Sequence, residues 1–232
     1  MDEPILTTIE ARILGCLIEK ERTTPEYYPL TLNALLAAAN QKSNRDPIMY
    51  LDETEIQKAV DGLRQKGFLW KKMTAGSRVP KFEHALLEKY KLSPSEVAVL
   101  CILLLRRPQT PGEINSRSGR LHAFESLQEV VVTLDGLAEG EDPMVMRLPV
   151  QPGKKEARFA HLLCGAQAAE EYADDAQASG GSTYPADGST VGAETRESLK
   201  ERIARLEEAV VDLHLQIEQI NEAFDRFRSQ FE

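Results

Sequence analysis

The sequence predicts a mainly α-helical fold with small β-hairpins (α+β), in which one unit occurs twice and is followed by a linker and a long C-terminal helix. Capping boxes precede apolar residues at helical spacing, and bulky segments flank turn-like residues as in hairpins. The same order of elements then recurs at constant offsets. With 42% hydrophobic and 28% charged residues, the 232-residue chain has the composition of a folded, water-soluble protein.

The first predicted unit contains three helices and a hairpin. The pair Thr7 and Glu10 has capping-box spacing and opens the first helix. Residues 32–39 repeat apolar side chains at helical period and form the second helix. Another capping box, in 52–55, opens the third helix, which ends at Gly67. Segment 68–82 places bulky residues on both sides of a glycine-containing turn, which predicts a hairpin.

The same order recurs in the second predicted unit. Residues 93–96 and 110–113 repeat the capping-box spacing, and the first helix is copied at an offset of 86 residues. The third helix is copied at an offset of 74, where Val60-Asp61-Gly62-Leu63 is echoed by Leu134-Asp135-Gly136-Leu137. A second hairpin is predicted in 144–160. We therefore predict two copies of one domain.

The composition changes after the second unit. Segment 166–195 is first Ala-rich and acidic and then rich in Ser, Gly and Thr, which predicts a flexible linker. In 196–232 the apolar residues alternate steps of four and three, the pattern of a coiled-coil helix. β-branched residues at a and Leu at d favour a parallel homodimer held by Leu199, Ile203, Leu206, Val210, Leu213, Ile217 and Ile220. A helix that folds back on its own body is the alternative. The predicted domains are thus 1–88 and 89–165, followed by the linker and the heptad helix.

Three helices followed by a two-stranded hairpin is the order of a winged helix, a helix-turn-helix variant whose third helix can enter the DNA major groove. The run Asn40-Gln41-Lys42-Ser43-Asn44-Arg45-Asp46-Pro47 and the later Val60-Asp61-Gly62-Leu63, together with the repeated unit, resemble the uncharacterised bacterial YceH-like family. The resemblance covers roughly residues 4–164 and implies tandem winged-helix domains. It implies no established activity.

The charge distribution favours duplex DNA as a partner of the first unit. The net charge of −9 arises after residue 162, because residues 1–162 carry 22 basic and 22 acidic side chains. Segment 58–91 has nine basic and three acidic residues, and phosphate attraction needs such a local positive surface. Asp61 on the third helix would repel the DNA backbone unless Arg64 pairs with it or its carboxylate faces a cytosine amino group. The predicted DNA contacts are Lys42, Asn44, Arg45, Thr54, Lys58, Gln65, Lys71, Lys72, Arg78 and Lys81.

Two of these groups have a second interpretation. The Asn and Ser residues of the connector 40–47 are also turn formers and helix caps. The hairpin lysines are also compatible with a solvated face.

The second unit indicates a different role. Segment 123–146 contains no Lys or Arg and six acidic residues, so it should repel phosphate. The outward face of its third helix, with Gln128, Val132, Asp135 and Glu139, suits a protein partner better than DNA.

Two functions therefore remain open. One is a dimeric DNA-binding protein of regulatory or chromosome-associated type. The other is a protein-interaction adaptor, similar in architecture to the tandem winged helices of bacterial segregation and condensation protein B.

Catalytic and metal chemistry is not predicted. The four His residues stand far apart, and neither a CxxC pair nor a phosphate-cradling Gly loop is present. We expect no enzyme activity, no cofactor and no metal, and reduced structural thiols at the three cysteines.

No apolar run reaches the roughly 18 residues of a membrane span, and the N-terminus lacks a basic region followed by an apolar stretch. We therefore expect a cytoplasmic protein without membrane contact.

Overall fold

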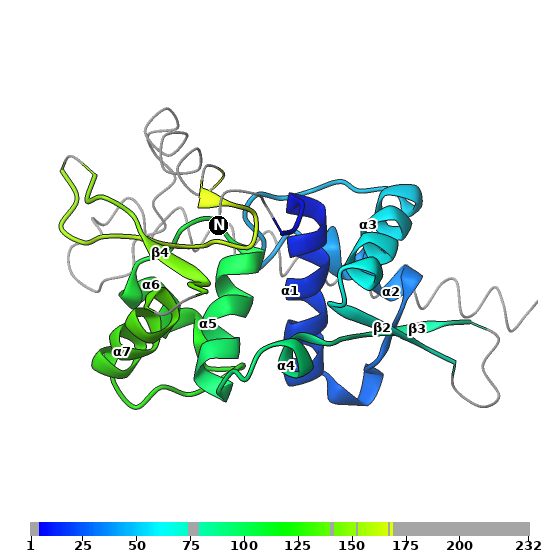
Figure 1. The fold of residues 1–232 in the computed structure, drawn as a ribbon, viewed down its shortest axis with the longest axis horizontal. Helices are drawn as coiled ribbons and strands as arrows, with labels where there is room; N and C mark the ends of the chain where they lie inside the picture. Colours follow the sequence, from blue (N-terminus) through cyan, green and yellow to red (C-terminus); the bar gives the residue numbers. More distant parts are fainter. Residues whose placement is uncertain (1–4, 74–78, 140–141, 152, 167, 169–232) are drawn as a thin grey trace, which may run out of the picture. The chain divides into compact units, whose positions relative to one another are not determined.

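The structure is a computed structural model that describes residues 5–73, 79–139, 142–151, 153–166 and 168 (Figure 1). The order helix, helix, helix, hairpin occurs twice in these residues, as the sequence predicts. The elements are α1 (Thr8–Thr23), a 3₁₀ turn (Pro25–Tyr27), β1 (Leu30–Thr31), α2 (Leu32–Ala39), α3 (Glu53–Gln65), β2 (Leu69–Lys72), β3 (Lys81–His84), α4 (Leu86–Lys89), α5 (Pro94–Leu105), α6 (Pro111–Ser118), α7 (Leu127–Ala138), β4 (Val145–Arg147) and β5 (Phe159–His161).

The capping boxes form as predicted. The Thr7 hydroxyl accepts a hydrogen bond from the Glu10 backbone N–H at 3.2 Å, and the Glu10 carboxylate accepts one from the Thr7 N–H at 2.7 Å. The same reciprocal pair opens α3, α5 and α6. Helix α3 ends before Gly67, whose φ of 73° lies in the left-handed region that glycine adopts without a Cβ clash. Local sequence signals therefore fix where these helices begin and end.

A short strand ties the first hairpin to the helices. Strand β3 pairs with β2 on one side and with β1 on the other, which gives the antiparallel order β1-β3-β2. Strand β1 has two residues, too few to show a periodic pattern, and the sequence did not predict it. In the second repeat β4 pairs with β5 alone.

The two repeats share one hydrophobic core, because α1 packs directly against α5. Gly15 of α1 makes this possible: a Cβ at this position would lie 2.9 Å from the Leu105 side chain and 3.1 Å from Cβ of Leu104. The Cys101 thiol lies 3.5 Å from the Gly15 carbonyl oxygen. Positions 15 and 101 correspond under the offset of 86 residues, so the two first helices meet at equivalent positions.

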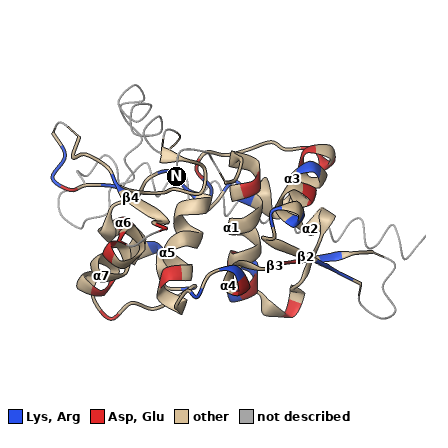
Figure 2. Cartoon of the chain, in the orientation of Figure 1, with Lys and Arg blue, Asp and Glu red and all other residues tan. Residues whose placement is uncertain are grey.

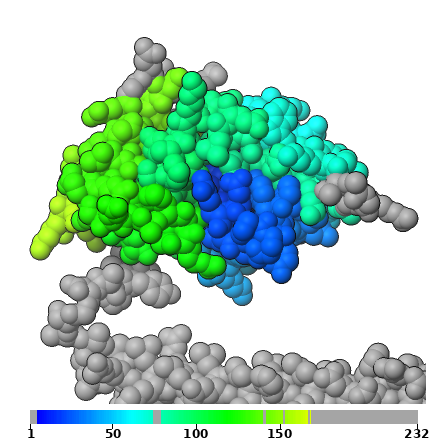
Figure 3. Space-filling model, turned by 90° about the horizontal axis from the view of Figure 1, so that it is seen from below, coloured from blue at the N-terminus to red at the C-terminus, as the bar shows by residue number. Residues whose placement is uncertain are grey.

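The start and end of the two-repeat body are also joined. The Leu6 N–H donates to the Leu163 carbonyl at 2.7 Å. Figure 3 shows the N-terminal residues in blue directly beside the second repeat in green. Both predicted winged-helix segments fall within one compact unit.

Some predictions fall outside the described residues. They concern the linker from residue 169 onward, the heptad helix 196–232 with its seven dimerisation residues, and Arg78 in the hairpin. Within the described ranges, no helix is long and apolar enough to cross a membrane.

The close contact between α1 and α5 leads to a stability prediction. Gly15→Gln should lower the free energy of unfolding by roughly 2–5 kcal/mol, because the new side chain overpacks the interface and buries an unsatisfied amide. Gly136→Gln is the matched control: α7 leaves open space at Gly136, with nothing within 4 Å of an added Cβ. This variant should gain up to about 1 kcal/mol from helix propensity. Urea unfolding measures both, and equal effects at the two positions would contradict the close packing.

Candidate nucleic-acid interface

Helix α3 presents the predicted residues to solvent. Its inward side buries Ile56, Ala59, Val60 and Leu63, while Thr54, Lys58 and Gln65 are exposed. The amphipathic spacing of the helix produces this division. Thr54 lies in the first turn, Lys58 one turn further along and Gln65 at the C-terminal end. These three side chains are accessible to a ligand.

The carboxylate of Asp61 on the same helix is neutralised locally. It accepts hydrogen bonds from the Gln57 amide at 2.9 Å and from the Arg64 guanidinium at 3.2 Å. This is one of the two arrangements in which the sequence analysis expects Asp61 to be compatible with DNA. Both partners come from α3, so the arrangement needs no other element.

The hairpin divides its lysines between two faces. Lys72 lies opposite Lys81 in the β2–β3 register, whereas Lys71 lies opposite the buried Phe82. Because successive side chains point to opposite faces of a sheet, Lys72 and Lys81 share one face and Lys71 lies on the other. The Lys72 ammonium forms an ion pair with Glu83 at 2.6 Å. The hairpin is therefore basic on both faces, and Lys72 is partly neutralised.

Several other cations of segment 58–91 are used inside the protein. Lys66 pairs with Glu10 at 2.6 Å. Lys89 donates to the Lys66 carbonyl at 2.9 Å, and its ammonium lies 4.4 Å from the centre of the Phe68 ring. In the part of the chain that the structure describes, Lys58, Lys71, Lys81 and Lys91 have no ion pair. Figure 2 shows basic residues on α3 and on β2–β3. The positive surface is thus smaller than the sequence count indicates.

Arg45 corrects one prediction. Its side chain is buried, and its guanidinium donates to both carboxylate oxygens of Glu19, at 3.0 and 2.6 Å. It also donates to the Ala38 carbonyl and to the Gln41 amide oxygen, both at 3.0 Å. Because these acceptors occupy the guanidinium inside the protein, the predicted contact of Arg45 with DNA is wrong. Arg45 instead anchors the connector to α1.

The rest of the connector has the same structural character. Both atoms of the Asn40 side-chain amide bond the Leu51 backbone at 2.8 Å. Asn44 adopts a φ of 57°, and its amide oxygen accepts a hydrogen bond from Arg106 at 2.8 Å. The Asp46 N–H donates to the Leu105 carbonyl at 3.1 Å. These residues thus form turns and hydrogen bonds within the protein, as the turn-forming interpretation expects. Lys42 differs from them because its side chain is exposed.

The second repeat presents a different surface. The predicted outward residues Gln128, Val132 and Asp135 of α7 are exposed, as is Glu139 directly after the helix, and Figure 2 shows the acidic residues of this helix. Val132 is 61% exposed. The face is therefore acidic with an apolar centre.

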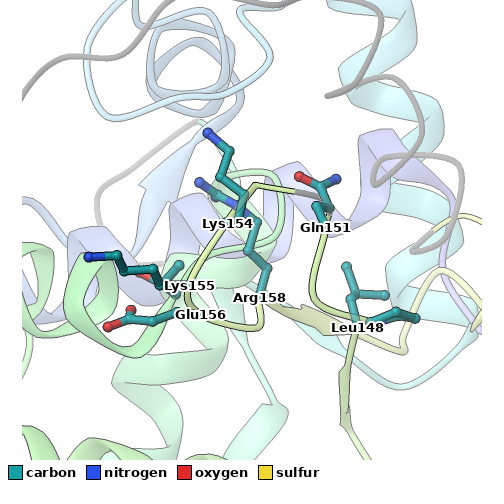
Figure 4. A pocket seen from close by; sticks show the side chains of 8 residues that line it. Leu148, Gln151, Lys154, Lys155, Glu156 and Arg158 are labelled. Atoms are coloured by element: carbon teal, nitrogen blue, oxygen red, sulfur yellow. The ribbon is translucent and has the colours of Figure 1, made fainter.

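The hairpin loop of the second repeat borders a pocket of about 200 Å³ (Figure 4). Arg158 in this pocket is held by Glu113 at 2.9 Å and by the Pro108 carbonyl at 2.6 Å. Lys154 and Lys155 are exposed at its rim. The free positive charge of this hairpin thus comes from the two lysines of its loop and from the exposed Arg147 of β4.

The thiols are poor nucleophiles. Burial raises the pKa of Cys16 to about 11 and that of Cys164 to about 11, and it also raises the pKa of Cys101. A thiol with such a pKa is protonated at neutral pH, and the thiolate is the reactive form. Over the described residues, no three His, Cys, Asp or Glu side chains are grouped so that they would hold a metal ion.

Comparisons with known proteins point to one family. The model of the family described as "Protein of unknown function, DUF480" matches residues 6–154. The "UPF0502 protein GSU0233" of Geobacter sulfurreducens is 47% identical over 232 residues, which cover 99% of this chain and 100% of that protein. A UPF0502 protein of Opitutus terrae is 55% identical over 163 residues, 70% of this chain and 71% of that protein. A UPF0502 protein of Shewanella sp. is 43% identical and covers 90% of this chain and 94% of its own length.

The burial of Arg45 gives a second stability prediction. Arg45→Met should destabilise the protein by about 3–5 kcal/mol, because it leaves the largely buried Glu19 carboxylate with only the longer ion pair to Lys20 at 3.7 Å. Lys42→Met, three residues away on the surface, should change stability by less than about 0.5 kcal/mol. Urea unfolding compares the two variants. A small effect of Arg45→Met would show that the guanidinium is not an anchor.

Proposed function

The chain belongs to the bacterial DUF480 family, and we propose that it is a DNA-binding protein of regulatory or chromosome-associated type whose first repeat is the binding module. In this proposal both repeats are winged helices. The observation that carries it is the exposed side of α3, with Thr54, Lys58 and Gln65, on a helix that contacts a basic hairpin. A helix that reads bases beside a hairpin that contacts phosphates is the division of labour expected of such a module.

Helix α3 supplies the base contacts. Lys58 suits guanine or a phosphate oxygen, and Thr54 and Gln65 suit base edges in the major groove. The first turn of α3 also carries Asp52 and Glu55, whose carboxylates are engaged in the capping box. This acidic end weakens phosphate attraction near Thr54. The hairpin must therefore provide most of the electrostatic affinity.

The hairpin supplies phosphate contacts. Lys72 and Lys81 lie directly opposite each other, and two like charges in this position are destabilising unless an anion is near. Glu83 relieves part of this repulsion, and a DNA phosphate would relieve the rest. Lys71 on the other face extends the basic surface, so a hairpin along the DNA backbone would contact phosphates with both faces.

Dimerisation through the C-terminal heptads completes the proposal. Two first repeats on one dimer would contact two half-sites and double the number of phosphate contacts. The number of neutralised phosphates per monomer is small here. A monomer would therefore bind DNA only weakly, and the dimer would bind DNA more tightly.

The proposal predicts salt-dependent binding that the first hairpin controls. Fluorescence anisotropy with labelled duplex DNA at about 50 to 200 mM salt should show affinity falling steeply as salt rises. Lys71→Ala/Lys72→Ala/Lys81→Ala should weaken binding to all sequences and reduce the salt slope by about three, roughly one per phosphate contact.

The matched control removes the same charge from the other hairpin. Arg147→Ala/Lys154→Ala/Lys155→Ala should leave the slope nearly unchanged. Binding that is undetectable or independent of salt would refute the proposal. An equal loss in both triple variants would place the contact outside the first repeat.

One observation favours an adaptor as the second candidate. On α7 the apolar residue Val132, which is 61% exposed, lies on the same helical face as Asp135, as in the apolar centre and charged rim of a protein interface. An adaptor should retain partners from nuclease-treated cell extract and lose them in Val132→Asp. Loss of all partners after nuclease treatment would instead indicate tethering through DNA.

A further inference from the structure

A polar cavity lies where the two repeats meet, away from the outer face of α3 and the first hairpin. Its volume is about 470 Å³, within the roughly 300–1,000 Å³ of small-molecule sites, which often lie at domain interfaces. The C-terminal parts of α1 and α5 line it together with the connector and the end of α6. Both repeats are therefore needed to form it.

The cavity wall is strongly positive. Arg106, Arg117 and Arg120 line it. Lys20 also lines it but pairs at 3.7 Å with the cavity's acidic residue Glu19, which the buried Arg45 engages as well. Among the described residues, neither Arg117 nor Arg120 forms an ion pair, and both are exposed. An unpaired group of guanidinium ions in a concave site is a receptor for an anion.

Arg106 is already placed to contact a ligand. Its guanidinium donates to the Asn44 amide oxygen at 2.8 Å, which fixes its direction at the edge of the cavity. Burial and the nearby positive charge of Arg117 lower the pKa of Arg106. This repulsion between cations would disappear when an anion sits between them.

Helix dipoles oppose an anion here, but their effect is smaller. The ends of α1, α5 and α6 line the cavity, and a helix C-terminus carries about −0.5 of an elementary charge. The α5 end is partly satisfied, because the Leu105 carbonyl accepts the Asp46 N–H at 3.1 Å. Arg106, Arg117 and Arg120 carry three full positive charges and outweigh these partial charges, so the local field still favours an anion.

The apolar part of the cavity wall indicates a ligand that has an uncharged part beside its anionic group. Ile102, Leu105 and Leu121 line the same cavity as the arginines. A free inorganic ion would leave these side chains without a contact. A small molecule that joins a phosphate group to an uncharged ring would use both parts of the wall. Such a molecule can enter a concave site, which a rigid duplex enters less easily.

We propose that this cavity binds a small phosphorylated molecule, with Arg106, Arg117 and Arg120 contacting its phosphate. The ligand would join the two repeats at their junction. The site shares no arginine with the proposed DNA surface, so it stands or falls independently of DNA binding.

Isothermal titration of the full chain with pyrophosphate and with ADP tests the proposal. ADP should bind more tightly than pyrophosphate, because its ring contacts the apolar wall. Arg117→Ala/Arg120→Ala should weaken both by roughly tenfold or more, since charge-assisted hydrogen bonds are lost. The control Lys91→Ala/Arg147→Ala removes the same charge from exposed positions outside the cavity and should bind like wild type. Thermal unfolding without ligand checks that both variants are folded.

The possible outcomes distinguish a small phosphorylated molecule from the DNA backbone as the ligand of the cavity. Wild-type binding that is lost only in the cavity variant supports the proposal. No binding by wild type, or equal binding by the two double variants, overturns it. Displacement of ADP by duplex DNA, with matching loss of DNA affinity in Arg117→Ala/Arg120→Ala, would assign the cavity to the DNA backbone and also overturn the small-molecule site.

Discussion

The absence of a side chain at Gly15 is the constraint on which the rest of the molecule depends. Because Leu104 and Leu105 occupy the space that a Cβ would need, α1 and α5 approach closely and the two repeats form one core. Two separate modules on a string would have independent orientations. Here the orientation of one repeat determines that of the other, so the α3 surface, the acidic α7 surface and the junction cavity are held in fixed positions.

The cations of the protein fall into two groups. One group forms ion pairs within the protein, and only the other group is available to a partner. Arg45, Lys66 and Arg158 each pair with a carboxylate and hold segments together, at donor–acceptor distances of 2.6 to 2.9 Å for their shortest ion pairs. Exposed cations without an ion pair include those of the first hairpin with α3 and those of the cavity at the junction. A positive surface in a protein with a net charge of −9 is therefore local. Both proposed binding sites use these remaining charges.

The fold could be predicted from the sequence where signals are local. Capping boxes lie within four residues, and the repeat of helix and hairpin segments is visible at fixed offsets. The exposed side of α3 followed from helical spacing. Three features depend on residues far apart and could not be predicted. Arg45 is buried because it meets Glu19, 26 residues away, and Lys72 lies opposite Lys81 because of the register of β2 with β3. The cavity requires segments of both repeats.

Hydrogen exchange on the full chain, with and without a short duplex DNA at low salt, tests the central claim most directly because it locates the contact on the unmodified protein. The account predicts slower exchange in α3 and in the β2–β3 hairpin, with α7 unchanged. Protection confined to α7, or no protection in any segment while DNA is in excess, would contradict binding through the first repeat.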